Sequence, residues 1–134
     1  MRSVAYEDTW DATYGLEIQE ATDSLARGRV PSIEPMLDPR SGVVNGGLYA
    51  SVAETLASYA TTIGVHAAGR IATGMYNSTH VARFMTEGEV NAVARVRSRA
   101  DDEWLWDVEM TDGAGEICAF STVCIAVRSN SPQS

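Results

Sequence analysis

Two glycines and one carboxylate in the middle of the chain have types and a spacing that could support chemistry. Gly46 and Gly47 follow Asn45 at the start of a long apolar segment, and Glu54 is the only charged residue from Asn45 to Val65. At a helix start the first backbone N–H groups lack an intrahelical partner, and glycine lets a ligand approach them closely. These groups could stabilise the negative charge that develops on the carbonyl oxygen of an ester or thioester.

Glu54 could supply the reacting group. A carboxylate on a covered helix face is unfavourable unless it is paired, and burial would raise its pKa toward the range of a general base or nucleophile. Each feature also has a structural explanation: the glycines could let a tight loop enter the helix, and Glu54 could form a salt bridge to an arginine of the sheet or of a partner chain. The residues alone leave both explanations open.

The distance between the two features favours a site that two chains share. Gly46 and Glu54 are eight residues apart, which corresponds to about 12 Å along a helix axis. They are therefore poorly placed to act on one carbonyl from a single helix. Two helices packed antiparallel about a two-fold axis would bring Gly46 of one subunit to Glu54 of the other. We therefore predict a homo-oligomer, either a dimer or a tetramer.

The segment that positions these residues is predicted to be a helix over residues 46–63. An apolar stripe repeats along it at three- and four-residue steps, and the opposite side carries small residues. Small residues are unusual on a solvated helix face, so we predict that a partner surface covers this side. The stripe consists of Leu48, Val52, Leu56, Tyr59 and Ile63, and the opposite side of Ala50, Ser51, Glu54, Ala57, Ser58 and Thr61.

Strands are predicted on both sides of this helix. A short helix at residues 3–12 is followed by strands at 14–21 and 25–33 and by a loop at 34–44. Four further strands are predicted at 71–84, 90–97, 104–110 and 117–127, with turns at 86–88 and 112–115. This order predicts an α+β fold in which an antiparallel β-sheet, joined largely by hairpins, wraps around one long central helix. Residues 1–128 are expected to form a single domain, and residues 129–134 a disordered tail.

Composition limits the classes of partner. The chain has 134 residues and a net charge of −8 with only ten Lys and Arg, which argues against a nucleic-acid partner or an anionic membrane surface. Glu54 and the many Ser and Thr residues argue against a membrane span at 43–67. Cys118 and Cys124 lie in one predicted strand, roughly 20 Å apart, and cannot bridge within it. Reduced thiols favour a cytoplasmic location.

The pattern Asn45-Gly46-Gly47, with Glu54 nine positions after Asn45, resembles the PaaI-type branch of the hotdog-fold thioesterases. The signature of that branch is His-Gly-Gly with an Asp or Glu nine positions after the His. The resemblance extends to the order of strands and turns over residues 14–127 and implies a hotdog fold. It also implies hydrolysis of an acyl-CoA thioester without a metal or redox cofactor, so that coenzyme A takes part only as a portion of the substrate.

The resemblance also assigns roles to residues. Gly46 matches the glycine whose N–H polarises the thioester carbonyl, and Glu54 matches the acid that attacks the carbonyl or activates water. Ser58 matches a hydroxyl position that assists in some members, although a helix Ser more often bonds back to a carbonyl. Asn45 completes the catalytic set. Candidate substrate-binding residues are Gly47, the strand-start residues Thr73, Gly74 and Met75 near the acyl pocket, and Arg83 and Arg99, which could meet the phosphates of coenzyme A or be ordinary solvent-facing charges.

Three positions depart from the family pattern. Asn45 replaces the His, Glu54 is one methylene longer than the commoner Asp, and Pro39 stands where related enzymes place an Asn or Gln. Asp38 or Arg40 could substitute for that amide through a shift of register. These departures leave open a non-catalytic hotdog module that binds an acyl-CoA or a similar small ligand.

A hotdog hydratase or dehydratase is a further alternative. Such enzymes usually pair a His with the acid, and His66 and His80 are poorly placed for that role. His66 is expected to be exposed after the helix, and His80 to be a histidine of an interface. No group of His, Cys and Asp has metal-ligand spacing.

Overall fold

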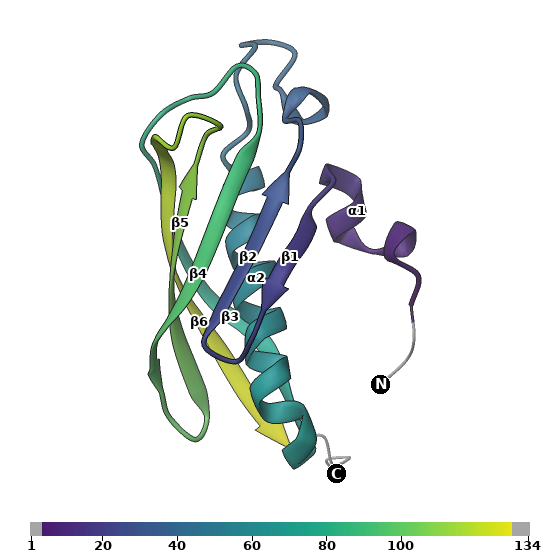
Figure 1. Cartoon of the computed structure of the whole chain (residues 1–134), viewed down its shortest axis with the longest axis vertical. Coiled ribbons are helices and arrows are strands. Elements are labelled where there is room, and N and C mark those ends of the chain that lie inside the picture. The colour runs from purple at the N-terminus through teal and green to yellow at the C-terminus, as the bar shows by residue number, and fades with distance from the viewer. Residues whose placement is uncertain (1–3, 130–134) are drawn as a thin grey trace.

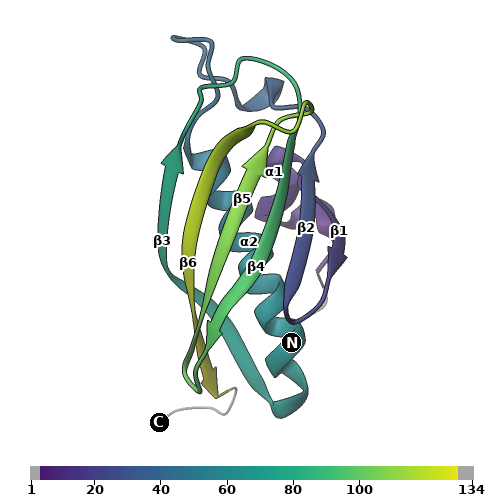
Figure 2. The same ribbon diagram turned by 60° about the vertical axis from the view of Figure 1, so that its left-hand side comes forward.

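The computed structural model describes residues 4–129, which form a six-stranded antiparallel sheet and one long helix (Figure 1). The strands lie in the order β1-β2-β4-β5-β6-β3, and α2 lies against one face of the curved sheet (Figure 2). The predicted α+β hotdog architecture is confirmed. The strands are β1 (Glu17–Ala21), β2 (Leu25–Val30), β3 (Arg70–Val81), β4 (Val90–Arg99), β5 (Glu103–Thr111) and β6 (Ile117–Ser129); the helices are η1 (Tyr6–Asp8), α1 (Trp10–Tyr14), η2 (Glu34–Met36), α2 (Gly47–Val65) and η3 (His66–Ala68).

The core lies between α2 and the sheet. Leu48, Val52 and Leu56 of the predicted stripe are buried there. On the sheet side, the predicted alternation of β5 is confirmed, because Trp104, Trp106, Val108 and Met110 are all buried. The indole N–H of Trp106 donates a hydrogen bond of 2.9 Å to Thr61 Oγ1 of α2, which satisfies the polar atom of this large buried side chain.

The predicted orientation of the second half of α2 is wrong. Tyr59 and Ile63, assigned to the buried stripe, are 49% and 45% exposed, whereas Ala57 and Thr61, assigned to the opposite side, are fully buried. The sheet presents a tryptophan to this part of the helix, and a close-packed interior requires small residues opposite such a large side chain. Part of the small-residue side is therefore covered by the chain's own sheet.

Two of the three connections among the last four strands are hairpins. β4 pairs with β5 and β5 pairs with β6. The turn predicted at 112–115 is confirmed, since the N–H of Gly115 donates to the carbonyl of Asp112 at 3.0 Å. The connection from β3 to β4 is a crossover, because β3 pairs with β6 whereas β4 pairs with β2. This crossover leaves β3 at the edge of the sheet.

The ends of the described chain differ in detail from the predictions. The predicted N-terminal helix consists of η1 and α1, and α1 ends at Tyr14 because Gly15 takes a left-handed conformation (φ 76°). The first strand therefore begins at Glu17. Ser129, assigned to the tail, is the last residue of β6 and pairs with Arg70. Residues 130–134 of the predicted tail lie outside the described residues.

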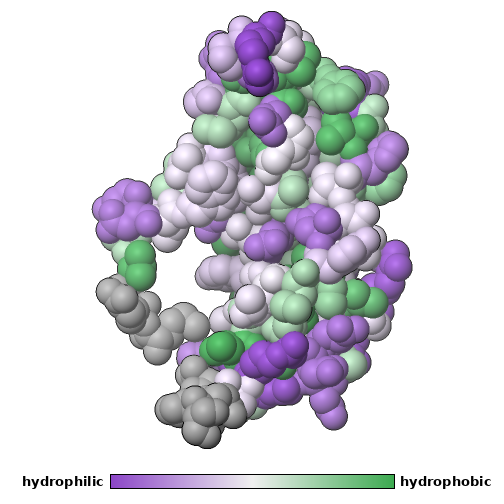
Figure 3. All heavy atoms as spheres, turned by 180° about the vertical axis from the view of Figure 1, so that it is seen from behind, coloured by the Kyte–Doolittle hydropathy of each residue, from purple (hydrophilic) through white to green (hydrophobic). Residues whose placement is uncertain are grey.

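The N-terminal segment stands away from the body of the molecule when it is viewed from behind (Figure 3). A cavity of about 850 Å³ is lined by residues of η1, α1 and β1 and by Tyr59 of α2. The surface in this view mixes pale, hydrophobic and hydrophilic residues. A broad apolar patch is therefore not what distinguishes this side of the protein.

Both cysteines are free thiols, as predicted. Burial raises the pKa of the Cys118 thiol. Within residues 4–129, no helix is long and apolar enough to cross a membrane. The same range holds no group of three or more His, Cys, Asp or Glu residues that could bind a metal ion.

Candidate active site

Among the described residues, the Gly46 N–H at the start of α2 has no hydrogen-bond partner. Asn45 Oδ1 accepts a hydrogen bond from the Gly47 N–H at 2.8 Å, and the Asn45 carbonyl accepts one from the Leu48 N–H at 3.0 Å. Gly46 has helical backbone angles (φ −58°, ψ −21°), and its N–H donates to no residue within 4–129. Gly46 therefore offers a free N–H at the positive end of the helix dipole, while Asn45 caps the helix.

Glu54 lies over a glycine of the neighbouring strand β3. A Cβ atom added to Gly74 would come within 2.7 Å of Glu54 Cδ and 2.9 Å of Oε1, so the absence of a side chain makes room for the carboxyl group. The Glu54 side chain is exposed, and it forms no ion pair with any other described residue. The burial and the salt bridge considered from the sequence are both absent from the described chain. This side of α2 is open.

Gly46 and Glu54 lie against different positions along the same edge strand, β3. A Cβ atom added to Gly46 would be 3.4 Å from Val81 Cγ2, whereas Glu54 lies against Gly74, seven residues earlier in β3. At about 3.3 Å per residue, the two contact points are roughly 20 Å apart along β3. The structure therefore keeps Gly46 and Glu54 apart within one chain, as their spacing in the helix predicts.

The other candidates around Glu54 differ in how far they are exposed. Thr73 is exposed, and Met75, which is 64% exposed, sits at a β-bulge between Gly74 and Tyr76. Ser58 is half-buried one turn after Glu54, and its carbonyl accepts a hydrogen bond of 2.8 Å from the Thr62 hydroxyl. Of the three strand-start candidates, Gly74 lies directly against the Glu54 carboxyl group.

The two candidate arginines lie at opposite ends of the sheet. Arg83 follows β3 near the start of α2, where it pairs with Asp112 and, at 3.5 Å, with Glu116. The Arg83 hydrogen bond lowers the pKa of Asp112. Arg99 ends β4 at the other end of the molecule, with its guanidinium 4.8 Å from the centre of the Trp104 ring. The structure thus brings Arg83 to the same end as Gly46 and holds Arg99 away from it.

Neither histidine belongs to the candidate site. His66 is exposed, as predicted, and begins the short helix η3 after α2. His80 is exposed on β3 and stacks on Phe120 of β6, with ring centroids 4.9 Å apart. No acid–histidine pair is therefore formed with Glu54 among the described residues.

A groove opens beside the start of α2. It has a volume of about 580 Å³, within the usual range for small-molecule sites, and both Asn45 and Gly47 line it. A smaller cavity of about 200 Å³ is lined by Glu54 and Asn77 and shares Trp10 and Ser51 with the groove. The apolar walls of the groove come from α1, from the loop before α2 and from α2 itself: Trp10, Tyr14, Met36, Leu37 and Leu48.

The loop that carries Pro39 lies at the same groove. Asp38, Pro39 and Arg40 all line it. Asp38 accepts hydrogen bonds from Arg40 Nη2 at 3.0 Å and from the Arg40 backbone N–H at 2.7 Å, and these bonds hold the pKa of Asp38 below its usual value. The two residues considered as substitutes for the family's amide are therefore at the groove and paired with each other.

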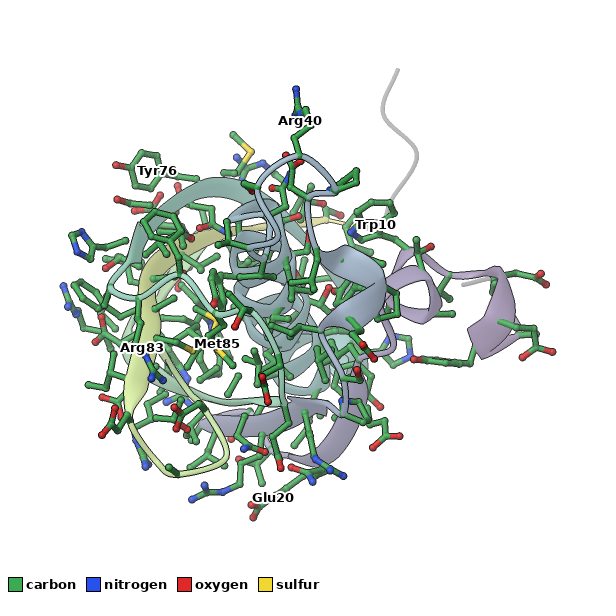
Figure 4. All side chains as sticks on the ribbon, turned by 90° about the horizontal axis from the view of Figure 1, so that it is seen from above. Trp10, Glu20, Arg40, Tyr76, Arg83 and Met85 are labelled. Carbon is green, nitrogen blue, oxygen red and sulfur yellow. The ribbon has the colours of Figure 1, made fainter. Side chains whose placement is uncertain are left out.

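The sequence interpretation missed the contribution of α1. Trp10 Nε1 donates a hydrogen bond of 3.2 Å to Ser51 Oγ, and Thr55 Oγ1 donates one of 2.8 Å to Asp11 Oδ1. Trp10 also packs edge-on against Tyr14, with ring centroids 6.0 Å apart, and burial raises the pKa of Tyr14. Figure 4, a view from above, shows Trp10 on the opposite side of the α2 start from Arg83. The only sequence signal for this role was a tryptophan in a short polar segment.

Comparisons with known proteins agree with the fold. No protein-family model matches the chain. A Mycobacterium tuberculosis protein described as "Putative esterase Rv1847" is 30% identical over 116 residues, which cover 85% of this chain and 82% of that protein. Its solved structure matches with a TM-score of 0.85 at 28% identity, covering 92% of this chain and 98% of that one. The thioesterase HI1161 from Haemophilus influenzae matches in fold with a TM-score of 0.85 at 20% identity, covering 94% and 87%.

The chain belongs to the PaaI-like family of hotdog-fold thioesterases. The predicted family is therefore confirmed. The relatives and structural neighbours of this PaaI-like protein are described as esterases and thioesterases, which supports a hydrolase that cleaves an ester or thioester bond.

Proposed function

We propose that this PaaI-like protein hydrolyses an acyl-CoA thioester to the free acid and CoA. The active unit is a homodimer, alone or as part of a tetramer, and each of its two active sites uses residues of both chains. One observation carries the proposal: both half-sites lie against the edge strand β3. Gly46 is next to Val81, and Glu54 lies over Gly74 of the same strand. Among the described residues, β3 has β6 as its single hydrogen-bonded neighbour.

An antiparallel pair of β3 strands would complete both sites at once. β3 has 12 residues, and the free backbone groups along its outer edge form a template for a further strand. In a pair centred near Asn77, midway between the two contact points, Gly74 of one chain faces Val81 of the other. Glu54 of one chain then comes alongside Gly46 of the other, and the two-fold axis repeats the arrangement.

Gly46 would act on the thioester carbonyl in the completed site. The carbonyl oxygen accepts a hydrogen bond from the free Gly46 N–H and lies at the positive end of α2, so negative charge on that oxygen is stabilised as the transition state forms. Asn45 supports this role by capping the helix through Gly47, which fixes the first turn. Arg40 and Arg83, at the same end of α2, are the proposed partners of the CoA phosphates.

Glu54 of the facing subunit would act as nucleophile or general base. As a nucleophile, its carboxylate adds to the carbonyl carbon, the C–S bond breaks, CoA leaves as the thiolate, and water cleaves the resulting anhydride. As a base, it takes a proton from a water molecule that attacks the same carbon. Both routes release the acid and the thiol. The open setting of Glu54 in the single chain supports a role toward a second chain.

Glu54→Gln tests the proposal. The variant should lose about 10²–10⁴-fold in kcat, because a positioned carboxylate contributes that much to such reactions. Thiol release is followed with aryl, short-chain and long-chain acyl-CoA substrates, and dimer mass and thermal midpoint are measured in parallel. Both physical properties should stay unchanged, since Glu54 forms no ion pair with a described residue.

Glu109→Gln serves as the matched control, because Glu109 is an exposed glutamate on β5. It should retain wild-type turnover. Near-normal turnover in Glu54→Gln would remove Glu54 from the mechanism, and a monomeric active wild type would contradict the shared site. Tight binding of acyl-CoA by the wild type without hydrolysis would support a non-catalytic module instead.

A further inference from the structure

Trp10 is shared by the two cavities of the candidate site. The larger groove reaches Asn45 and Gly47, and the smaller cavity reaches Glu54 and Asn77. Trp10 and Ser51 line both spaces. Under the proposed dimer, the groove serves the site that the partner's carboxylate completes, whereas Glu54 of the same chain serves the other site. Trp10 would therefore border parts of two different active sites.

The composition of the groove suits the acyl portion of a thioester. Its walls include Met36, Leu37 and Leu48, and it begins at Asn45 and Gly47, next to the free N–H that would hold the carbonyl. A carbonyl at this point directs its acyl group into the adjoining apolar space, where burial of each methylene is favourable. The acyl group would end against Trp10.

Trp10 is held in place rather than loosely attached, although 66% of its surface is exposed. Its indole N–H bonds to Ser51, and its ring packs against Tyr14. Tyr14 is itself buried and shares polar contacts with Asp11 and Thr55. A side chain fixed from both sides can act as a wall, whereas a free surface side chain would yield to a ligand.

We propose that Trp10 sets the upper length of the acyl group by closing the groove against the cavity that contains Glu54. The inference rests on the proposed thioesterase function for the identity of the ligand. The favoured substrates are then thioesters of acyl groups short enough to end at the indole. Removal of the indole would join spaces of about 580 and 200 Å³ and admit longer chains.

The test measures chain-length dependence in the wild type and in Trp10→Ala. Acyl-CoA substrates from acetyl to dodecanoyl give kcat/KM, and the matching non-hydrolysable S-alkyl-CoA thioethers give dissociation constants by calorimetry. In the wild type, affinity should rise roughly fourfold per methylene and then level off or fall once the chain reaches the indole. In Trp10→Ala this limit should move to longer chains in both measurements.

Three further variants test whether a shift of the chain-length limit comes from loss of the indole or from a general loosening of the N-terminal segment. Trp10→Phe retains a ring and should shift the limit less than Trp10→Ala, and it remains informative if the alanine variant is unstable. Ser51→Ala leaves the indole but removes its hydrogen bond. The chain-length limit should therefore become less sharp without moving as far as in Trp10→Ala. Tyr6→Phe breaks the bond from Tyr6 to the Leu16 carbonyl, away from the groove, and should leave the limit unchanged.

Failure of this inference is distinguishable from failure of the proposed function. If the thioethers show the limit and its shift but no thioester is cleaved, the proposed function is wrong and the role of Trp10 stands. If thioesters are cleaved but the limit is the same in wild type, Trp10→Ala and Trp10→Phe, the role of Trp10 is overturned. Absence of any thioether binding by the wild type overturns it as well.

Discussion

The two halves of α2 use small residues in opposite ways. In the second half, Ala57 and Thr61 are fully buried beneath the sheet, and Thr61 accepts the hydrogen bond of Trp106. In the first half, Gly47 and Glu54 are exposed, and the groove and the smaller cavity open beside them. We call the second half closed because its own chain covers Ala57 and Thr61, and the first half open because the two cavities border it.

This difference shows that small residues on a helix predict a close neighbour but not its identity. Small side chains let a partner approach, and close packing then requires that something fill the space. In the second half, the chain's own tryptophan fills it. In the first half, we propose that substrate and a second chain do so.

Of the substitutions that compare the two halves of α2, those at Gly46 have the largest expected effect, and they separate the contribution of its N–H from that of its small size. Gly46→Pro removes the N–H and adds a pyrrolidine ring, and the φ of −58° at this position suits proline at a helix start. We expect kcat to fall by about 10²–10³-fold, the usual cost of losing one oxyanion donor. Gly46→Ala retains the N–H and places its Cβ 3.4 Å from Val81, an ordinary contact, so it should lose far less. Equal losses in single-turnover assays would exclude the N–H as the donor.

A pair of glycine substitutions compares the open and closed halves directly. At Gly64, in the closed half, an added Cβ would collide with the buried Trp104 ring, so Gly64→Ala should destabilise the fold by about 1–3 kcal/mol, less the gain in helix propensity of up to about 1 kcal/mol. At Gly74, an added Cβ would displace the exposed Glu54 carboxyl group. Gly74→Ala should therefore lower kcat by up to about 10²-fold with little loss of stability.

Thermal unfolding and thiol release, measured on both variants, check this contrast. The two variants should differ in which quantity changes. If Gly74→Ala lowers the thermal midpoint as much as Gly64→Ala does, the contrast between an open first half and a closed second half of α2 is wrong.

Much of the architecture was predictable because its signals are local and repeated. The alternation from Trp104 to Met110 identified a strand with one buried face, and the turn from Asp112 to Gly115 identified a hairpin. The spacing of Gly46 and Glu54 also predicted that one chain cannot bring them together. Helix geometry alone fixes that distance.

The missed features depend on contacts between distant parts of the chain. Tyr59 and Ile63 fit a helical stripe, but only the position of Trp106 in the folded sheet decides which side of α2 is buried there. The bond from Trp10 to Ser51 joins residues 41 positions apart, and no local pattern predicts such a contact. The crossover that leaves β3 at the sheet edge is a property of strand order in space.

The smallest expected effect concerns the loops at the open end of α2. The Arg83 hydrogen bond lowers the pKa of Asp112 from its ordinary value of 3.8, so this pair stabilises the fold above that pH, and the contribution is lost as pH falls through the lower folded-state pKa. Asp112→Asn should lower the thermal midpoint slightly at neutral pH, and the difference from wild type should shrink in acid. Asp101→Asn, at an exposed residue without an ion pair in the described chain, should show no such trend. A constant difference at all pH values would contradict the assignment.

The site shared by two chains is tested most directly by combining two inactive variants in one dimer. Glu54→Gln and Gly46→Pro chains, carrying different affinity tags, are co-expressed, and the hybrid is isolated through both tags. In the hybrid, one site has both functional residues unaltered and the other has both altered. We predict that the hybrid has about half of the wild-type thiol release per dimer, although neither parent dimer is active. A hybrid no more active than its parents would contradict a site built from Gly46 of one chain and Glu54 of the other.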